Sequence, residues 1–513
     1  MATSILFWLA PIVSGLLVTV SLPSFDLGFL AWLALSPLLF CLRQKGPFAA
    51  LGLGFLFGLA FTGSCFYWLN AVPDVTPSRF LMLIAALSVY PVVFALLYNL
   101  TSAAIGSWVI LAAPALWVAL EYARVSLFFL AVPWNLIAHS QYRYLPLIQI
   151  ADMTGVYGIS FLIVTANQVV SEIPDVLASR RLRINWPTHL LALGLLLVGT
   201  LAYGWFRLAA PEGEGSLRVA VVQANVLARD RMSVQEQMQH LGAYARLTME
   251  AAKHKPDLVI WPSSSLPAPY SFGHVRFYVG LLARQYGTPL VVGGSGGDKF
   301  PIPQDGLPPH ANTEFLITPS GRLGGQYNKV HLTPFTEYLP LDGRIKWPPW
   351  ITALPKSFVP GDSYTLFQVS HARFGTPICW ESLFPDIFRR FVRDGAHFMV
   401  NVTNEGVFGV TSAPYQTLAM NAFRAVENRV TVVRAATTGI SAFISSKGEI
   451  LDRVKDANGR DLFVSGILVR DVPLSRTRTF YTVAGDVFAY TVIGVAALVL
   501  GASIVSRARV RVP

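Results

Sequence analysis

Charged residues are scarce in this sequence. Only 13% of its 513 residues are Asp, Glu, Lys or Arg, whereas a soluble protein carries roughly 25%. Hydrophobic residues make up 53% of the chain, and the mean hydropathy is +0.49. These values exclude an ordinary soluble protein and predict that much of the chain faces lipid.

Cysteine is also rare, and its scarcity and spacing exclude two further classes. The three cysteines are Cys41, Cys65 and Cys379, and the first two lie in apolar stretches. An odd and sparse set argues against a disulfide framework. Neither the cysteines nor the nine scattered histidines have metal-ligand spacing, and the glycine-rich segment 293–297 lacks the lysine of a phosphate-binding loop. We therefore expect no metal and no cofactor.

Long apolar runs dominate what is present. Eight of them approach or reach the length that crosses a bilayer, and the second is the shortest: 5–22, 29–42, 47–69, 80–97, 102–123, 145–170, 189–206 and 483–505. The first run has no cleavage pattern after it, so we expect it to be retained. The sequence therefore predicts a multi-pass α-helical membrane protein with eight transmembrane helices.

Basic clusters predict the orientation of these helices. They are Arg507, Arg509 and Arg511 after the last run, Arg43 and Lys45 after the second, and the cluster 180–183. With an even number of spans, all three fall on the cytoplasmic side, as the positive-inside rule requires. Residues 208–482 then lie outside, which in a bacterial inner membrane is the periplasm. The net charge of +11 is then accounted for without nucleic acid, and we expect no nucleic-acid partner.

The outer segment alternates strand-like and helical patterns. Strands are predicted at 217–223, 257–262, 290–294, 314–318 and 322–328, with helices at 232–253 and 275–286. Such alternation indicates an α/β domain. We predict three parts: a seven-helix domain over 1–207, a catalytic domain over 208–482, and an eighth helix with a basic tail over 483–513.

Polar residues follow three of the predicted strands. Cys379 ends an apolar run, Ser263 follows a Trp-Pro pair, and Lys329 follows another strand. Sheets of parallel strands gather such ends at one edge. A thiol there is a candidate nucleophile, and a lysine nearby would lower its pKa and stabilise an oxyanion. The alternatives are a buried, inert cysteine and a solvated surface lysine.

Three longer motifs carry a family resemblance. They are Trp261-Pro262, then the segment 327–338 (YNKVHLTPFTEY), then 378–385 (ICWESLFP), and the match extends through 401–409, 424–429 and 438–441. In this order they resemble the nitrilase superfamily of carbon–nitrogen hydrolases. With the apolar runs on both sides, the whole chain resembles the apolipoprotein N-acyltransferase family.

This resemblance implies an αββα sandwich on the outer face of the inner membrane. It also implies transfer of an acyl chain from a glycerophospholipid, through a thioester on Cys379, to the N-terminal amine of a diacylglyceryl-apolipoprotein. Lys329 matches the lysine that holds the oxyanion. Glu337 and Glu381 match acidic residues that support the site.

One catalytic position departs from the family pattern. The family has a glutamate directly after Trp-Pro, and this chain has Ser263. Serine carries no charge near neutral pH and is a poor base. Three interpretations are open: a substitution introduced to stall the enzyme, a natural paralogue with lost or altered activity, or a base supplied by Glu337, Glu381 or His331.

The predicted substrate-binding residues are Trp380, Tyr338 and Met232. Trp380 is beside the nucleophile and would wall the pocket, although a core aromatic is an equal alternative. Met232 and Val407 stand where the family often has tryptophan. Two rival functions remain: a membrane-tethered amidase that uses water as the acceptor, and an inactive lipoprotein-binding paralogue, which Ser263 keeps open.

Overall fold

The chain forms two compact units in a computed structural model. The structure describes residues 2–73, 75–102, 104–178, 185–227, 232–296, 310–348 and 358–510. One unit, called here the helical unit, comprises Met1–Ala210 and Ala484–Pro513, and the other, the α/β unit, comprises Pro211–Val483. The basic cluster at 180–183 and Arg511 lie outside the described residues.

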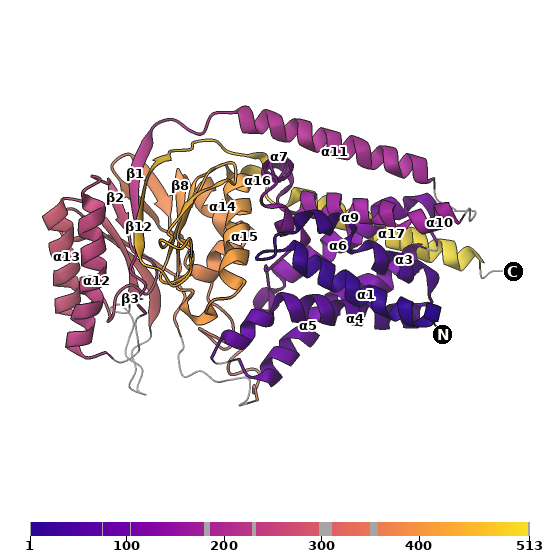
Figure 1. Cartoon of the computed structure of the whole chain (residues 1–513), viewed down its shortest axis with the longest axis horizontal. Coiled ribbons are helices and arrows are strands. Elements are labelled where there is room, and N and C mark those ends of the chain that lie inside the picture. Colours follow the sequence, from indigo (N-terminus) through magenta and orange to yellow (C-terminus); the bar gives the residue numbers. More distant parts are fainter. Residues whose placement is uncertain are drawn as a thin grey trace. The chain divides into compact units, whose positions relative to one another are not determined.

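The helical unit is built from apolar helices (Figure 1). Those described are α1 (Ala2–Ser21), α2 (Ala31–Ala34), α3 (Ser36–Gln44), α4 (Pro47–Cys65), α5 (Pro77–Ser102), α6 (Val109–Ser126), α7 (Leu145–Ile148), α8 (Ala151–Thr154), α9 (Tyr157–Ser171), α10 (Ile173–Leu177), α11 (Trp186–Ala209) and α17 (Val487–Val510). The C-terminal α17 packs on α6 of the N-terminal part, where the hydroxyl of Tyr122 donates a 2.8 Å hydrogen bond to that of Tyr490.

Five described helices are long and apolar enough to cross a membrane, and the number is six if one bent pair counts as a span. The bent pair, Leu145–Thr154 with Tyr157–Leu177, falls on the predicted run 145–170 and turns by 120°. Gly155 lies at the break with a φ of 63°, a conformation that favours glycine and ends a helix. Phe7–Ser21 and Gly28–Gln44 are shorter apolar helices. The count of eight spans stays a prediction.

The described part of the α/β unit forms two six-stranded sheets, which confirms the predicted α/β domain. The first has the order β12 (Gly466–Pro473), β1 (Ser216–Gln223), β2 (Leu258–Ile260), β3 (Leu290–Gly296), β4 (Ala311–Ile317) and β5 (Leu323–Asn328). The second has the order β11 (Ile450–Arg453), β10 (Ala442–Ile444), β9 (Val432–Ala436), β8 (Phe398–Thr403), β7 (Ala372–Gly375) and β6 (Leu366–Val369). The larger helices of the unit are α12 (Val234–Ala252), α13 (Gly273–Tyr286), α14 (Pro385–Arg393) and α15 (Ala413–Asn428), and the short α16 (Phe480–Ala484) comes last. Figure 1 shows α12 and α13 outside one sheet and α14 and α15 outside the other.

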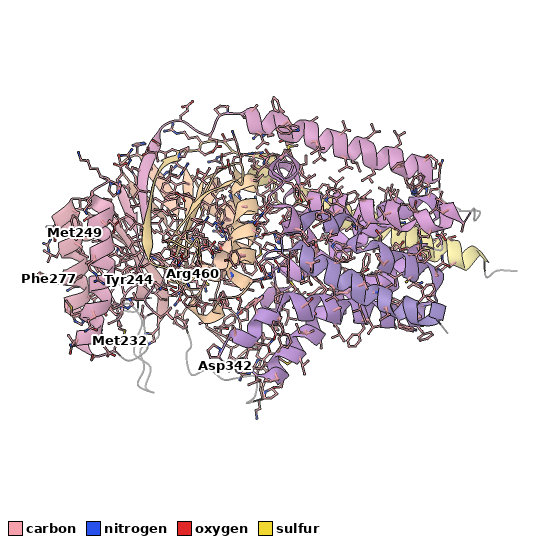
Figure 2. The ribbon with its side chains drawn as sticks, in the orientation of Figure 1. Met232, Tyr244, Met249, Phe277, Asp342 and Arg460 are labelled. Carbon is pink, nitrogen blue, oxygen red and sulfur yellow. The ribbon has the colours of Figure 1, made fainter. Side chains whose placement is uncertain are left out.

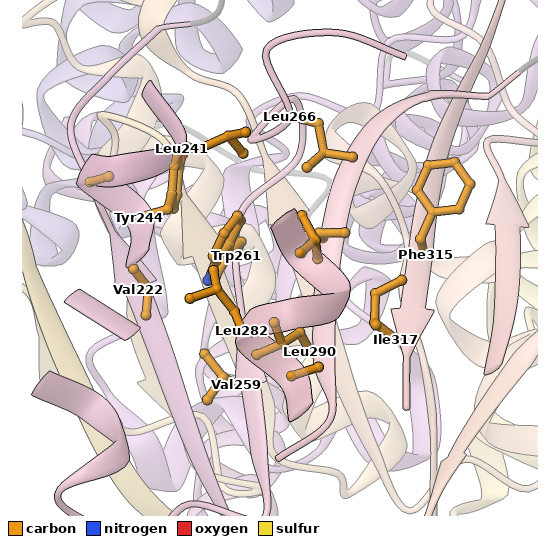
Figure 3. Packing of buried hydrophobic residues seen from close by; sticks show 14 of the residues in the cluster. Val222, Leu241, Tyr244, Val259, Trp261, Leu266, Leu282, Leu290, Phe315 and Ile317 are labelled. Atoms are coloured by element: carbon orange, nitrogen blue, oxygen red, sulfur yellow. The ribbon is translucent and has the colours of Figure 1, made fainter. Parts of the chain in front are cut away.

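A hydrophobic core joins the first sheet to α12 and α13 (Figure 3). Trp261, directly after β2, is fully buried and stacks on Tyr244 of α12 with ring centroids 4.7 Å apart. Its indole N–H donates a 2.9 Å hydrogen bond to the hydroxyl of Thr248. The strand end that precedes Ser263 is therefore held rigidly.

Strand direction decides which residues meet. β1, β2 and β3 are parallel, and β4 runs antiparallel to both β3 and β5. The carboxyl ends of β2 and β5 therefore lie at the same edge of the first sheet, together with the amino end of β4. Ser263 follows β2, Lys329 follows β5, and Asn312 lies at the start of β4.

Candidate active site

Cys379 lies four residues after the end of β7, at the start of the 3₁₀ helix η6 (Cys379–Leu383). Its φ is 51°, a left-handed conformation that is uncommon for a residue with a side chain and is enriched at functional sites. The residue is half-buried. The side-chain amide of Asn401 on β8 donates a 3.2 Å hydrogen bond to the carbonyl of Pro377, which fixes the approach to this turn.

Glu381 holds two parts of the site together. It is fully buried, and its Oε1 accepts hydrogen bonds from the backbone N–H groups of Val330 and His331 at 2.8 and 2.9 Å. Its Oε2 accepts one from Ile378 N–H at 2.8 Å. One carboxylate therefore binds the chain next to Lys329 and the chain next to Cys379. Tyr327 also donates its hydroxyl to Glu381, at 2.9 Å. Glu381 is thus engaged in positioning rather than free to act as a base.

Lys329 and Glu337 form a buried ion pair. The Nζ of Lys329 lies 2.7 Å from Oε2 of Glu337 and 3.3 Å from the hydroxyl of Thr333. Lys329 is only 1% exposed. Burial by itself raises the pKa of Glu337, but the charge of Lys329 and hydrogen bonds from Lys329, Thr333 N–H and Asn312 outweigh it, so the pKa lies below its ordinary value. The site therefore holds a fixed cation in the segment that Glu381 ties to the turn at Cys379.

This pair predicts an acid-sensitive contribution to stability. Because the pKa of Glu337 is lowered on folding, the pair stabilises the fold above the unfolded value of about 4.3, and the contribution is lost as pH falls through the folded pKa. We expect Glu337→Gln to lower the melting temperature of the full-length protein at pH 6, with the difference from the parent shrinking toward pH 3.5. A difference that grows on acidification would contradict this assignment.

Ser263 is held beside this cluster. It is 1% exposed, and its hydroxyl donates a weak hydrogen bond to Oδ1 of Asn312 at 3.5 Å. The amide of Asn312 in turn donates to Oε1 of Glu337 at 3.4 Å. A second serine fixes the turn, because Ser265 exchanges hydrogen bonds with the backbone of Gly293. Ser263, Asn312, Glu337 and Lys329 therefore form one connected chain of polar groups.

The predicted binding residues are more dispersed. Trp380 is half-buried and packs edge-on against Phe384, with ring centroids 5.7 Å apart. Tyr338 lies directly after Glu337, and its carbonyl accepts the N–H of Phe335 at 2.8 Å. Figure 2 shows Met232 just before α12, in the outer helical layer. The contacts among the described residues do not show whether these three side chains bind substrate, so that role stays a prediction.

His331, which the sequence left open as a base, has its ring against Phe384 with centroids 4.2 Å apart. Burial lowers its pKa. The described residues contain no group of three or more His, Cys, Asp or Glu side chains that could hold a metal ion.

Sequence reasoning missed three buried polar residues. Asn312 bridges Ser263 to Glu337. Arg434 on β9 pairs with Glu405 and donates to the carbonyl of Ile440 at 2.9 Å. Glu314 lies on β4, two residues after Asn312. A carboxylate at the start of the predicted strand 314–318 was the available signal for Glu314.

Comparison with known proteins identifies the family of this chain. Residues 14–169 match the model of the apolipoprotein N-acyltransferase N-terminal domain, and residues 218–482 match that of carbon-nitrogen hydrolase. The apolipoprotein N-acyltransferase of Geobacter metallireducens is 37% identical over 96% of this chain and 94% of its own length. That of Chlorobaculum tepidum is 28% identical over 95% and 94% respectively. A crystal structure of an amidase from Nesterenkonia sp. matches with 19% identity and a TM-score of 0.36, over 52% of this chain and 94% of the amidase.

Both family models match in the expected order, and the Geobacter relative matches over nearly the full length of both chains. The polar cluster around Cys379, Lys329 and Glu337 lies within the segment that the carbon-nitrogen hydrolase model covers. The chain therefore belongs to the apolipoprotein N-acyltransferase family, with a carbon–nitrogen hydrolase domain as its α/β unit.

Proposed function

We propose that this chain transfers an acyl chain from a membrane glycerophospholipid to the N-terminal amine of a diacylglyceryl-cysteine on apolipoproteins. Family membership supports an N-acyltransferase that acts on lipoproteins. The observation that carries the finer proposal is the position of Cys379. Its backbone is held in a left-handed turn, and Glu381 ties that turn to the loop that bears the buried Lys329.

The first half-reaction forms a thioester. The Sγ of Cys379 attacks the ester carbonyl of the phospholipid, so a C–S bond forms and the C–O bond to the glycerol oxygen breaks. The thiol proton ends on that oxygen, and a lysophospholipid leaves. Lys329 stabilises the negative charge that develops on the carbonyl oxygen, because its ammonium is fixed before the reaction and shielded from water.

The second half-reaction regenerates the enzyme. The amine of the apolipoprotein attacks the thioester carbonyl, a C–N bond forms, and the C–S bond breaks. A proton passes from the amine to the departing sulfur, which restores the Cys379 thiol. No cofactor is needed, because the ester supplies the acyl group and the thioester keeps it reactive.

The proposed location is the bacterial inner membrane, with the α/β unit in the periplasm. The apolar helices support a membrane protein. The basic clusters near Arg43 and Arg507 support the periplasmic side, because the positive-inside rule assigns such clusters to the cytoplasm. Both substrates carry acyl chains, so a site served from the outer leaflet lets each remain in lipid.

Intact-mass spectrometry tests this function. The full-length protein in detergent is mixed with vesicles of phosphatidylethanolamine and phosphatidylglycerol, and then with a diacylglyceryl-cysteine lipopeptide. We expect Cys379 to gain the mass of one acyl chain, and the lipopeptide to take that chain when it is added. Release of free fatty acid without lipopeptide acylation would favour the amidase. Lipopeptide binding without any acyl mass would favour the inactive paralogue.

A further inference from the structure

The space beside Ser263 is occupied by the side chain of Glu314. On the first sheet Glu314 of β4 pairs with Gly293 of β3. A Cβ placed on Gly293 would lie 2.5 Å from Oε1 of Glu314 and 2.6 Å from Cα of Ser263. The carboxyl group therefore passes over a glycine that leaves room for it. Its oxygen reaches the immediate surroundings of the position where the family has its glutamate.

Glu314 is buried without the partners that such a group normally has. It is 0% exposed, and neither carboxylate oxygen makes a hydrogen bond of ordinary geometry to any residue that the structure describes. Burial raises its pKa well above the ordinary value, and the nearby Ser263 hydroxyl lowers it only in part. A buried carboxyl without partners is costly for a fold and is enriched at functional sites.

The other acidic groups of the site are already engaged. Glu337 is bound to Lys329 at 2.7 Å. Glu381 accepts three backbone N–H groups and the hydroxyl of Tyr327. Glu314 differs from both, because neither of its oxygens has a hydrogen bond of ordinary geometry among the described residues, and the hydroxyl of Ser263 is close to it.

We propose that Glu314 is the base that replaces the missing glutamate, and that the Ser263 hydroxyl relays protons between it and the reacting groups. The proposal rests on the proposed function, since it concerns the same two half-reactions. The family's glutamate follows β2, whereas in this chain the carboxylate comes from the neighbouring part of β4. Ser263 is then a working part of the site rather than a lost catalytic residue.

The proton balance is the same in both halves. When Cys379 attacks the ester, its proton passes to Oγ of Ser263 while the serine proton passes to Glu314. The reverse transfer then protonates the departing glycerol oxygen. In the second half the amine proton takes the same path, and it returns to the sulfur of Cys379. A base whose pKa is raised toward the working pH suits both directions of transfer.

A carboxylate exchange between the two positions tests the proposal. The rate of acyl-enzyme formation is measured by intact mass for the parent, Glu314→Gln, Ser263→Ala, and the double variant Ser263→Glu/Glu314→Gln. We expect Glu314→Gln and Ser263→Ala each to slow acylation by about 10²–10⁴-fold. The double variant restores the carboxylate at the family's position, and we expect it to recover to within about tenfold of the parent. Ser263→Glu alone should acylate more slowly than the double variant, because two neighbouring carboxyl groups disfavour each other's ionisation.

Stability separates catalysis from a structural role. Glu314→Gln and Glu314→Leu remove a buried ionisable group without partners, so we expect melting temperatures equal to or above that of the parent. Thr431→Val is the matched control, because the Thr431 hydroxyl is also buried without a hydrogen bond among the described residues. It lies directly before β9 in the second sheet, outside the proposed relay, and we expect parental acylation.

The outcomes distinguish this proposal from the function on which it rests. Parental acylation by Glu314→Gln overturns the relay and leaves the acyltransferase in place. A slow parent that Ser263→Glu alone accelerates also overturns the relay, because it means that no base was present. If neither the parent nor the double variant forms an acyl-enzyme while both fold, the proposed function fails and the relay fails with it.

Discussion

Replacing Cys379 by alanine is expected to abolish acyl-enzyme formation and to lower lipopeptide acylation by about 10⁴-fold or more. In the proposed mechanism the sulfur of Cys379 holds the acyl chain between the two half-reactions, and alanine offers no nucleophile. The measurement is intact mass with phospholipid vesicles, followed by assay of the triacylated lipopeptide. Any acyl mass on the alanine variant would place the thioester elsewhere and contradict the proposal.

The two other cysteines provide matched controls. Cys41 and Cys65 are buried in the helical unit, and Cys65 accepts a hydrogen bond from the side-chain amide of Asn135 at 2.9 Å. We expect Cys41→Ala and Cys65→Ala to keep the acyl-enzyme, since neither residue belongs to the α/β unit. A Cys379→Ser variant completes the set, because it keeps the size of the side chain while replacing the thiol with a weaker nucleophile.

Local pattern was enough to predict much of the α/β unit. Apolar runs with strand character at 217–223 and 290–294 correspond to β1 and β3, and the helical spacing at 232–253 corresponds to α12. The polar residues at strand ends also indicated which segments lie close together, because Glu381 joins the chain beside Lys329 to the chain beside Cys379. The catalytic roles of these residues remain predictions.

Long-range geometry limited the rest. Glu314 occurs in a sequence that predicts a strand, and nothing local shows that β4 places it opposite Gly293 with its side chain toward Ser263. The three residues weighed as substitute bases were those in the family motifs. The apolar run 145–170 shows a similar limit: hydropathy measures composition and does not predict the 120° bend, which depends on the backbone conformation of Gly155.

Replacing Lys329 by methionine is expected to reduce both activity and stability. Methionine keeps much of the length of the side chain but removes the charge that would hold the oxyanion, which should cost about 10²–10³-fold in acylation rate. It also leaves Glu337, only 8% exposed, without its cation. Breaking a buried ion pair on one side typically costs about 3–5 kcal/mol of folding free energy. Acylation rate and thermal unfolding of the full-length protein measure the two effects.

The double variant Lys329→Met/Glu337→Gln separates these two effects. Removing both charges eliminates the unpaired buried carboxylate, so we expect most of the lost stability to return. Acylation should not return, because the oxyanion still lacks its cation. Recovery of both would mean that Lys329 acts only by holding the fold, and the oxyanion would then need another donor. If only the stability returns, the network of Ser263, Asn312 and the Glu381 loop is intact without Lys329. The missing acylation is then assigned to a direct part of Lys329 in the chemistry.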